Sequence, residues 1–178
     1  MCARSAATHC APASCNRCAE KHGINLTMPR DKLRTYEIYL DIIRGRLHPL
    51  PGAVDFVRAA RLRGYKLALA TSADRVKMIG NLTEIGLAVE AFDAVVTGDD
   101  VARKKPDPQI FLLAAERLAL PPAECLVIED APNGVQAARA AGCCCLGILS
   151  SFSPQRLQRA GAQWVAADLF HAPPEITA

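Results

Sequence analysis

The sequence predicts one α/β domain built around a parallel β-sheet. Short runs of aliphatic and β-branched residues recur along the chain, and segments of ~10–15 residues with helical periodicity separate them. This alternation is typical of βαβ units, in which a helix connects two parallel strands. The 178 residues are enough for one domain with a substantial core. The expected strands are residues 66–70, 94–97, 125–128, 143–149 and 164–166.

Two of the intervening segments are predicted to be helices from the spacing of their apolar residues. Residues three or four positions apart lie on one side of a helix, so this spacing produces an apolar face. The first predicted helix precedes the first strand, and its apolar residues are Leu33, Tyr36, Leu40 and Ile43. The second follows that strand, and its apolar residues are Val76, Ile79, Leu82 and Ile85.

Local signals mark the ends of other helices. Asp107 can accept hydrogen bonds from the free N–H groups at a helix start, and Pro108 suits the first turn because it has no N–H to leave unpaired. Gly142 is expected to end the helix over 135–141 in the left-handed conformation. The segment 49–52, rich in proline and glycine, separates the first helix from the rest and indicates a domain boundary.

Composition and charge exclude several classes of protein. Hydrophobic residues make up 51% and charged residues 22% of the chain, as in ordinary globular proteins, which excludes a mainly disordered or fibrous chain. The formal charge of +3 and the single basic run at 103–105 are too weak for a nucleic-acid-binding surface. No window reaches the ~18 consecutive apolar residues of a membrane span, and the first residues lack the apolar core of a secretory signal. We therefore expect a cytoplasmic protein without nucleic-acid or membrane partners.

The eight cysteines do not have the pattern of a disulfide framework. Four lie near the start of the chain, three are consecutive at 143–145, and Cys125 stands between these groups. Consecutive cysteines in an apolar run behave as small buried hydrophobic residues, whose side chains alternate between the two faces of a strand. We therefore expect free thiols in a reducing compartment.

Residues 1–19 differ from the rest of the chain, and three interpretations remain open. They contain no acidic residue, are rich in Ala and Ser, and show no periodicity. This composition is typical of a disordered leader, and also of an organelle transit peptide, which would place the protein in a chloroplast or mitochondrion. A metal site is the third interpretation, although the spacing of its four ligands is not a common zinc pattern. Those ligands would be Cys10, Cys15, Cys18 and His22.

Polar residues near the ends of the predicted strands suggest a phosphate site. Thr71 and Ser72 end the first strand, where hydroxyl and backbone N–H groups can bind phosphoryl oxygens. Lys105 precedes a helix and offers a compact positive charge. Glu129 and Asp130 follow the third strand, and two adjacent carboxylates are costly there unless a cation such as Mg²⁺ binds them. Taken singly, a strand-ending Thr and a loop Lys are also common in turns and on solvated surfaces.

Together and in this order, these segments resemble the haloacid dehalogenase superfamily, specifically its β-phosphoglucomutase-like phosphatases and phosphomutases. The resemblance covers residues 19–170 and includes PLPGAVDFVRAARLRGYKLALATSADR, TGDDVARKKPDPQIFLLAAERL and CLVIEDAPNGVQAARAAG. It implies a Rossmann-like core of three layers. It also implies that Thr71 binds phosphate and that Lys105 steadies the nucleophile and the phosphoryl group during transfer. Glu129 and Asp130 would be the magnesium ligands.

The family's catalytic motif has no counterpart in these 178 residues. In the family, an apolar strand ends in Asp-x-Asp-Gly-Thr, whose first Asp attacks phosphorus and whose second Asp is the general acid and base. No Asp-x-Asp occurs here, and the adjacent Asp99 and Asp100 resemble the family's ordinary TGDD turn. That missing strand is the centre of the family's sheet, between the strands that end at Thr71 and Glu129. Without it, those two strands must pair directly, leave a gap or recruit another segment.

The resemblance implies a leader over residues 1–19, a remnant of the family's helical cap over 20–48, and the α/β core over 49–178. The expected function is a magnesium-dependent phosphatase or phosphomutase for small phosphate monoesters such as phosphosugars, present as an incomplete or inactive chain. The alternative is a non-catalytic module that binds a phosphorylated ligand or a partner segment. The expected ligand is therefore a small phosphorylated metabolite, and the expected state is a monomer.

Overall fold

The computed structural model describes residues 30–177 and divides the chain into two compact units, Met1–Asp41 and Ile42–Ala178. Helix α2 (Arg30–Ile43), which confirms the helix expected there, provides the described residues of the first unit and ends in the first two residues of the second. The strands belong to the second unit, which also carries the candidate site. Among the described residues, no helix is both long and apolar enough to cross a membrane.

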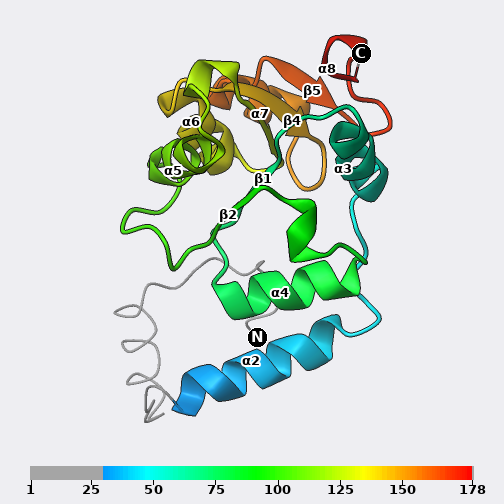
Figure 1. The fold of residues 1–178 in the computed structure, drawn as a ribbon, viewed down its shortest axis with the longest axis vertical. Coiled ribbons are helices and arrows are strands. Elements are labelled where there is room, and N and C mark those ends of the chain that lie inside the picture. The colour runs from blue at the N-terminus through cyan, green and yellow to red at the C-terminus, as the bar shows by residue number, and fades with distance from the viewer. Residues whose placement is uncertain (1–29, 178) are drawn as a thin grey trace. The chain divides into compact units, whose positions relative to one another are not determined.

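Helices and strands alternate along the second unit (Figure 1). The strands are β1 (Ala68–Ala70), β2 (Ala94–Val96), β3 (Leu126–Glu129), β4 (Cys144–Ile148) and β5 (Trp164–Ala166). The α-helices are α3 (Ala53–Leu62), α4 (Arg75–Glu84), α5 (Gln109–Leu118), α6 (Pro132–Ala140), α7 (Pro154–Ala160) and α8 (Pro174–Thr177). Two short 3₁₀ helices, η1 (Val89–Ala91) and η2 (Pro122–Glu124), precede β2 and β3. All five predicted strands are confirmed.

The strands form two parallel sheets instead of one. β1 pairs with β2, and Leu69 lies opposite Val95. β3, β4 and β5 form the second sheet, in which Val127 lies opposite Cys145. Within residues 30–177, no strand pairs with the remaining edge of β1 or of β3. Of the three outcomes that the sequence left open for these two strands, direct pairing is therefore excluded, and the parallel α/β class is confirmed.

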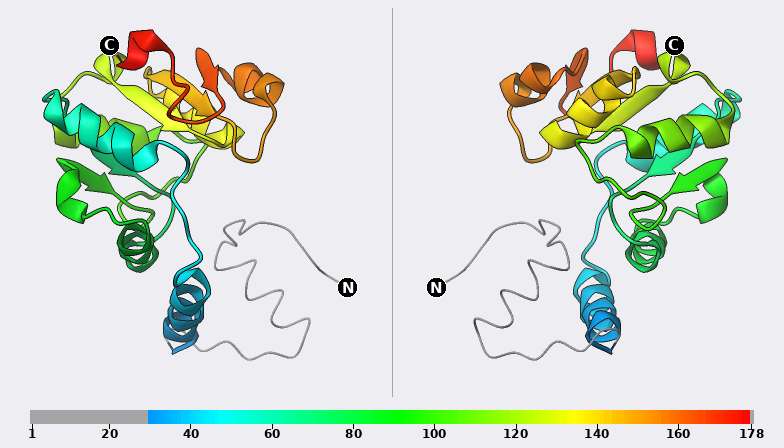
Figure 2. Two further views of the ribbon diagram at one scale, coloured as in Figure 1. Left: turned by 90° about the vertical axis from the view of Figure 1, so that its right-hand side faces the viewer. Right: turned by 90° about the vertical axis from the view of Figure 1, so that its left-hand side faces the viewer.

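Helices and loops cover the two faces of these sheets. α5 packs on β1 and β2, α6 packs on β3 and β4, and α7 packs on β4 and β5 (Figure 2). On the opposite face of β4, Leu146 and Ile148 pack together with Leu169 and Ile176 of the C-terminal segment. The result is the three-layer arrangement that the resemblance implied.

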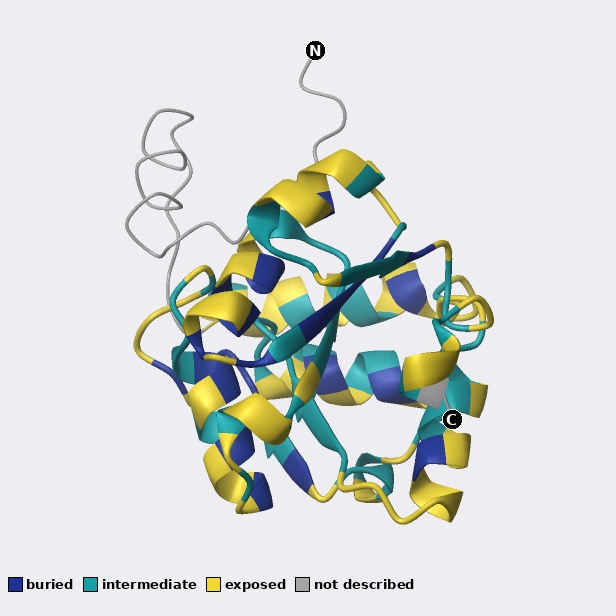
Figure 3. Ribbon diagram, turned by 90° about the horizontal axis from the view of Figure 1, so that it is seen from above, coloured by how far each residue is buried: buried dark blue, intermediate teal, exposed yellow. Residues whose placement is uncertain are grey.

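β4, at the centre of the larger sheet, has both of its faces buried. Cys145 is 0% exposed and belongs to the core that α5, α6 and α7 cover, whereas Leu146, also 0% exposed, belongs to the core on the other face. Neighbouring residues of the strand thus alternate between the faces, and Figure 3 shows the buried segments towards the interior of the fold. The cysteines of the described residues are free thiols, as predicted. Burial raises the pKa of Cys145 to about 12.

One predicted apolar face differs from the observed one. The sequence places Val76 and Ile79 on the apolar face of the second helix, but in α4 these residues are 41% and 44% exposed. The buried residues are Leu82, which belongs to the predicted face, and Met78, which does not. A helix of this length meets the rest of the unit along one narrow stripe, so the tertiary contact decides which of its apolar residues are buried.

The predicted helix ends are close to the observed ones. α5 begins at Gln109, whose N–H donates to Asp107 Oδ1 over 2.9 Å, so Asp107 accepts from a free N–H group at the helix start, as expected. Pro108, expected in the first turn, is instead the N-cap residue. Gly142 has a φ of 84°, which confirms the left-handed conformation after α6.

Candidate phosphate site

The loop after β1 contributes the hydroxyl groups of the candidate site. The Thr71 N–H donates to the Val96 carbonyl over 2.9 Å and thereby ends the pairing of β1 with β2. Thr71 Oγ1 then accepts a 3.1 Å hydrogen bond from the N–H of Ala73, and Asp74 caps the start of α4. Because Thr71 and Ser72 are half-buried, their side chains remain partly open to a ligand at the carboxyl end of β1.

The loop after β2 lies directly against this first loop. The Gly98 N–H donates to the Ala73 carbonyl over 2.7 Å. A Cβ at Gly98 would lie 2.3 Å from the Ser72 carbonyl oxygen and 2.9 Å from Lys104 Nζ, so a residue with a side chain does not fit without a shift. Lys104 Nζ donates to the Gly98 carbonyl. The carboxyl ends of β1 and β2 and the lysine-bearing loop are thus packed together.

Lys105, and not Lys104, faces the carboxylates that follow β3. Its Nζ forms an ion pair with Glu129 Oε1, and each of the two side chains is only 10% exposed. The same Nζ lies 4.7 Å from the centre of the Phe111 ring. Pairing and the aromatic face both stabilise a charge that burial would otherwise penalise. The structure therefore places a positive charge at a fixed position beside the end of β3.

Glu129 lies over the first turn of α6. Its Oε2 accepts hydrogen bonds from the N–H groups of Asp130 and Ala131, at 3.1 Å and 3.3 Å. A Cβ on Gly134 would lie 2.1 Å from Glu129 Cδ, so the carboxylate occupies space that is free because Gly134 has no side chain. The helix start and the Lys105 ammonium both favour the charged carboxylate. Glu129 thus connects Lys105 to the body of the domain.

Asp130 has a different partner, which the sequence analysis missed. Its Oδ2 accepts a 2.7 Å hydrogen bond from Ser150 Oγ. Ser150 directly follows the predicted strand over 143–149, just as Thr71 follows the predicted first strand. A hydroxyl residue directly after a predicted parallel strand is the signal that could have identified it. Ser150 therefore belongs to the candidate site.

Asp100 holds the shape of the loop that carries the lysines. Its Oδ2 accepts hydrogen bonds from both the N–H and the Oγ1 of Thr97, each 2.7 Å long. Its Oδ1 pairs with Arg117 at 2.8 Å. The hydrogen bonds from Arg117 and then from Thr97 hold the pKa of Asp100 well below its usual value. Asp100 is thus an anionic anchor of the TGDD turn.

The carboxylates after β3 are oxygen donors of the kind that could hold a magnesium ion. Among the described residues, no group of three or more His, Cys, Asp or Glu side chains forms a metal site. Mg²⁺ needs only one or two protein carboxylates, because water and substrate phosphate complete its shell. Glu129 uses both oxygens for Lys105 and backbone N–H groups, whereas Ser150 engages one oxygen of Asp130. Asp130 is therefore the better placed ligand. The suggested ligands Cys10, Cys15, Cys18 and His22 lie outside the described residues.

The family model of haloacid dehalogenase-like hydrolases matches residues 20–142 of this chain. The chain belongs to this family. It is 42% identical over 140 residues to Protein SUPPRESSOR OF QUENCHING 1, chloroplastic, of Arabidopsis thaliana, a match that covers 78% of this chain and 13% of that protein. It is 40% identical over 114 residues to the phosphorylated carbohydrates phosphatase of Thermotoga maritima, which covers 62% of this chain and 51% of that protein.

Solved structures agree with this assignment. A variant of CbbY from Rhodobacter sphaeroides, in complex with xylulose-(1,5)-bisphosphate, superposes with a TM-score of 0.72 at 28% identity and covers 81% of this chain and 66% of its own. A protein of Thermotoga maritima assigned as a β-phosphoglucomutase superposes with a TM-score of 0.72 at 31% identity and covers 93% of this chain and 74% of its own. This hydrolase-family chain thus belongs to the β-phosphoglucomutase-like branch, as the resemblance predicted. It spans 13% and 51% of the two curated relatives above.

Proposed function

We propose that this chain carries the phosphate-binding part of a magnesium-dependent phosphatase or phosphomutase site for small phosphate monoesters such as phosphosugars. The buried ion pair of Lys105 and Glu129, next to Asp130, is the observation that carries the proposal. The names of two similar proteins support the ligand class, since one is a phosphatase of phosphorylated carbohydrates and the other is bound to a sugar bisphosphate.

The proposed roles follow from the contacts. Lys105 supplies a positive charge to the phosphoryl oxygens, and Glu129 orients it. Thr71 and Ser72 donate hydrogen bonds to the same oxygens from the end of β1. Asp130, oriented by Ser150, is the carboxylate that would hold Mg²⁺, with Glu129 close by. When bound, Mg²⁺ would neutralise charge on the phosphoryl group.

These 178 residues contain no Asp-x-Asp motif, so they lack the nucleophile that the family mechanism requires. We therefore expect negligible turnover of phosphate esters by this chain alone. The same observation favours a second candidate function, a non-catalytic module that binds a phosphorylated ligand without cleaving it. The two functions share their ligand and differ in whether a carboxylate nucleophile is supplied.

Calorimetry with inorganic phosphate and Mg²⁺ tests the shared part of the proposal. We expect phosphate to bind the wild-type chain and Lys105→Gln to weaken binding by about tenfold, or ~1.4 kcal/mol. Lys104→Gln is the matched control, because Lys104 is the neighbouring lysine but donates to Gly98 instead of pairing with Glu129. Phosphate affinity that is absent in the folded wild type, or equally reduced by both substitutions, would contradict the proposal.

For the cellular location, we propose the cytoplasm, with an organelle as the alternative. One similar protein is named as chloroplastic, which supports the alternative. A fluorescent fusion that carries residues 1–29 tests this point. Fluorescence confined to chloroplasts or mitochondria would decide for the organelle.

A further inference from the structure

Two cysteines lie opposite each other at the amino ends of β3 and β4. Leu126 pairs with Cys144 in the parallel register, so Cys125 and Cys143, one residue earlier on each strand, are also opposite. The Cys144 N–H donates to the Cys125 carbonyl over 3.0 Å, which extends the pairing to these positions. Because β3 ends at Glu129, the two cysteines lie at the end of the strand remote from the candidate phosphate site.

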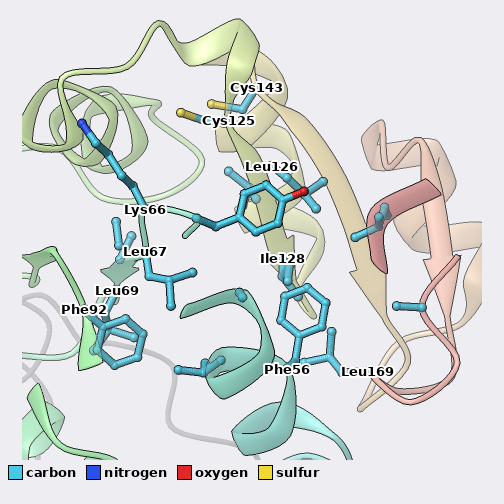
Figure 4. A pocket seen from close by; sticks show the side chains of 18 of the residues that line it. Phe56, Lys66, Leu67, Leu69, Phe92, Cys125, Leu126, Ile128, Cys143 and Leu169 are labelled. Atoms are coloured by element: carbon cyan, nitrogen blue, oxygen red, sulfur yellow. The ribbon is translucent and has the colours of Figure 1, made fainter. Parts of the chain in front are cut away.

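The side chains of these two cysteines share one face of the sheet. Cys143 is 1% exposed and belongs to the core that α5, α6 and α7 cover, and Cys125 is partly buried and packs against the same core. In Figure 4 both sulfur atoms point to the same side.

The other two described cysteines have different neighbours. Cys144 points to the opposite face of β4, because successive residues of a strand alternate between faces. Cys145 lies two residues further along the strand and is opposite Val127. Among the described cysteines, Cys125 and Cys143 are therefore the one pair that faces across neighbouring strands.

The backbone spacing at this pair suits a disulfide bond. Neighbouring strands lie about 4.8 Å apart, and a disulfide joins residues whose Cα atoms are about 4.4–6.8 Å apart and whose Cβ atoms point to the same side. Hydrogen bonds hold both residues in place, since the Cys125 N–H donates to the Pro122 carbonyl and the Cys143 N–H donates to the Ala138 carbonyl, each over 3.0 Å. Rotation of the two side chains is thus enough to bring the sulfur atoms together.

The two thiols differ in access and in acidity. Burial, and then the charge of the nearby Cys125 thiolate, raises the pKa of Cys143 to about 11. Burial and the charge of Glu124 also raise the pKa of Cys125, but this residue is only partly buried. A reagent in solution therefore reaches Cys125 first.

We propose that Cys125 and Cys143 form a dithiol site that low-molecular-weight disulfides oxidise reversibly to an intramolecular disulfide. The Cys125 thiolate attacks one sulfur of the small disulfide, which forms a mixed disulfide and releases the first small thiol. Cys143 then gives up its proton and displaces the second small thiol, which forms the Cys125–Cys143 bond. Two electrons and two protons pass from the protein to the small disulfide. Excess small thiol reverses both steps, so the dithiol is the form expected under reducing conditions.

The proposed bond closes a loop that runs from Cys125 to Cys143. This loop contains β3 and α6, and with them the carboxylates Glu129 and Asp130. A covalent link across such a loop restricts the unfolded chain, so we expect oxidation to raise the melting temperature by about 5 °C or more. This inference goes beyond the proposed function and does not depend on phosphate binding.

Oxidised glutathione is the probe that tests the proposal on the full chain. After incubation, the remaining thiols are alkylated and the tryptic peptides are analysed by mass spectrometry. Trypsin cleaves after Arg117, Arg139 and Arg156, so Cys125 and the cysteines at 143–145 fall in different peptides. We expect these two peptides to be cross-linked and to separate on addition of dithiothreitol. Absence of the cross-link, or a glutathione adduct that remains on Cys125, would overturn the proposal.

Two alanine variants identify the partner of Cys125. Cys143→Ala is expected to abolish both the cross-link and the rise in melting temperature. Cys144→Ala is the matched control, because Cys144 is the adjacent cysteine on the opposite face, and we expect it to keep both effects. Cys125→Ala removes the same bond from its partly exposed side, so the test does not depend on a substitution in the core. A cross-link that persists in Cys143→Ala or is lost in Cys144→Ala would contradict the assigned pair.

Discussion

The two sheets differ in how completely their strands are covered. β4 has a strand on each side and packed residues on both faces, and its Cys145 and Leu146 are fully buried. The three residues of β1 are also apolar but only half-buried, and among residues 30–177 β1 has a partner strand on one side alone. The contrast between β4 and β1 thus reflects what covers each strand, more than the hydrophobicity of its residues.

The largest expected effect is at the centre of the larger sheet. Leu146→Ala removes a side chain that is 0% exposed and packs with Ile148 and Ala166. We expect a loss of about 2–5 kcal/mol in the free energy of unfolding, because a buried cavity remains. Urea denaturation followed by circular dichroism measures this loss. A loss below about 1 kcal/mol would mean that β4 is not the stable centre of the fold.

A smaller effect is expected where the larger sheet meets the candidate site. Gly134→Ala places a Cβ 2.1 Å from Glu129 Cδ, so the carboxylate must move or the helix must shift. We expect a loss of about 1–3 kcal/mol in urea denaturation, together with weaker phosphate binding, since Glu129 orients Lys105. Gln136→Ala, at an exposed position of the same helix, is the control and is expected to stay within about 0.5 kcal/mol.

Asp100 is the anionic anchor of the turn at the end of the smaller sheet. Its contribution to the free energy of unfolding depends on pH. Because the pKa of Asp100 in the folded state lies below its ordinary value of 3.8, the stabilisation is complete above that value and is lost as the pH falls further. Asp100→Asn is expected to cost about 1 kcal/mol at neutral pH, through weaker hydrogen bonds to Arg117 and Thr97. Urea denaturation at a series of pH values between pH 3 and pH 7, spaced about one unit apart, measures both effects. An acid-induced loss of stability that is as large in the variant as in the wild type would contradict this role.

The smallest effect is expected in β3, at the edge of the larger sheet. Leu126→Ala removes a side chain that is 38% exposed, and we expect a loss below about 1 kcal/mol for the chain alone. Urea denaturation measures this loss. A loss as large as that of Leu146→Ala would show that Leu126 is fully covered, and would remove the contrast between β3 and β4.

The strands and the turns that end them are the parts that the sequence predicts well. β5 has the predicted bounds, and Gly142 has the predicted conformation, because both depend on local patterns of a few residues. α7 is not predicted, since its seven residues are too few for a helical period to show. The exposed Val76 and Ile79 show the limit of the same reasoning, because helical spacing does not say which apolar residues meet a neighbour.

The candidate site is partly predictable for a related reason. Thr71, Lys105, Glu129 and Asp130 are identified by their positions near strand ends and by the resemblance to the family. The role of each of these residues is not predicted by the sequence, because it depends on contacts between residues far apart in the chain. Glu129 pairs with Lys105, and Asp130 pairs with Ser150, a residue that the sequence analysis leaves out.

The sequence by itself determines the α/β class, the family and the absence of an Asp-x-Asp nucleophile in these 178 residues, because each of these follows from local residue patterns. Only the tertiary structure decides whether β1 and β3 pair with each other, because the sequence left direct pairing, a gap and a recruited segment open. In the structure, α5 packs on β1 and β2, α6 packs on β3 and β4, and the two pairs of strands belong to separate sheets.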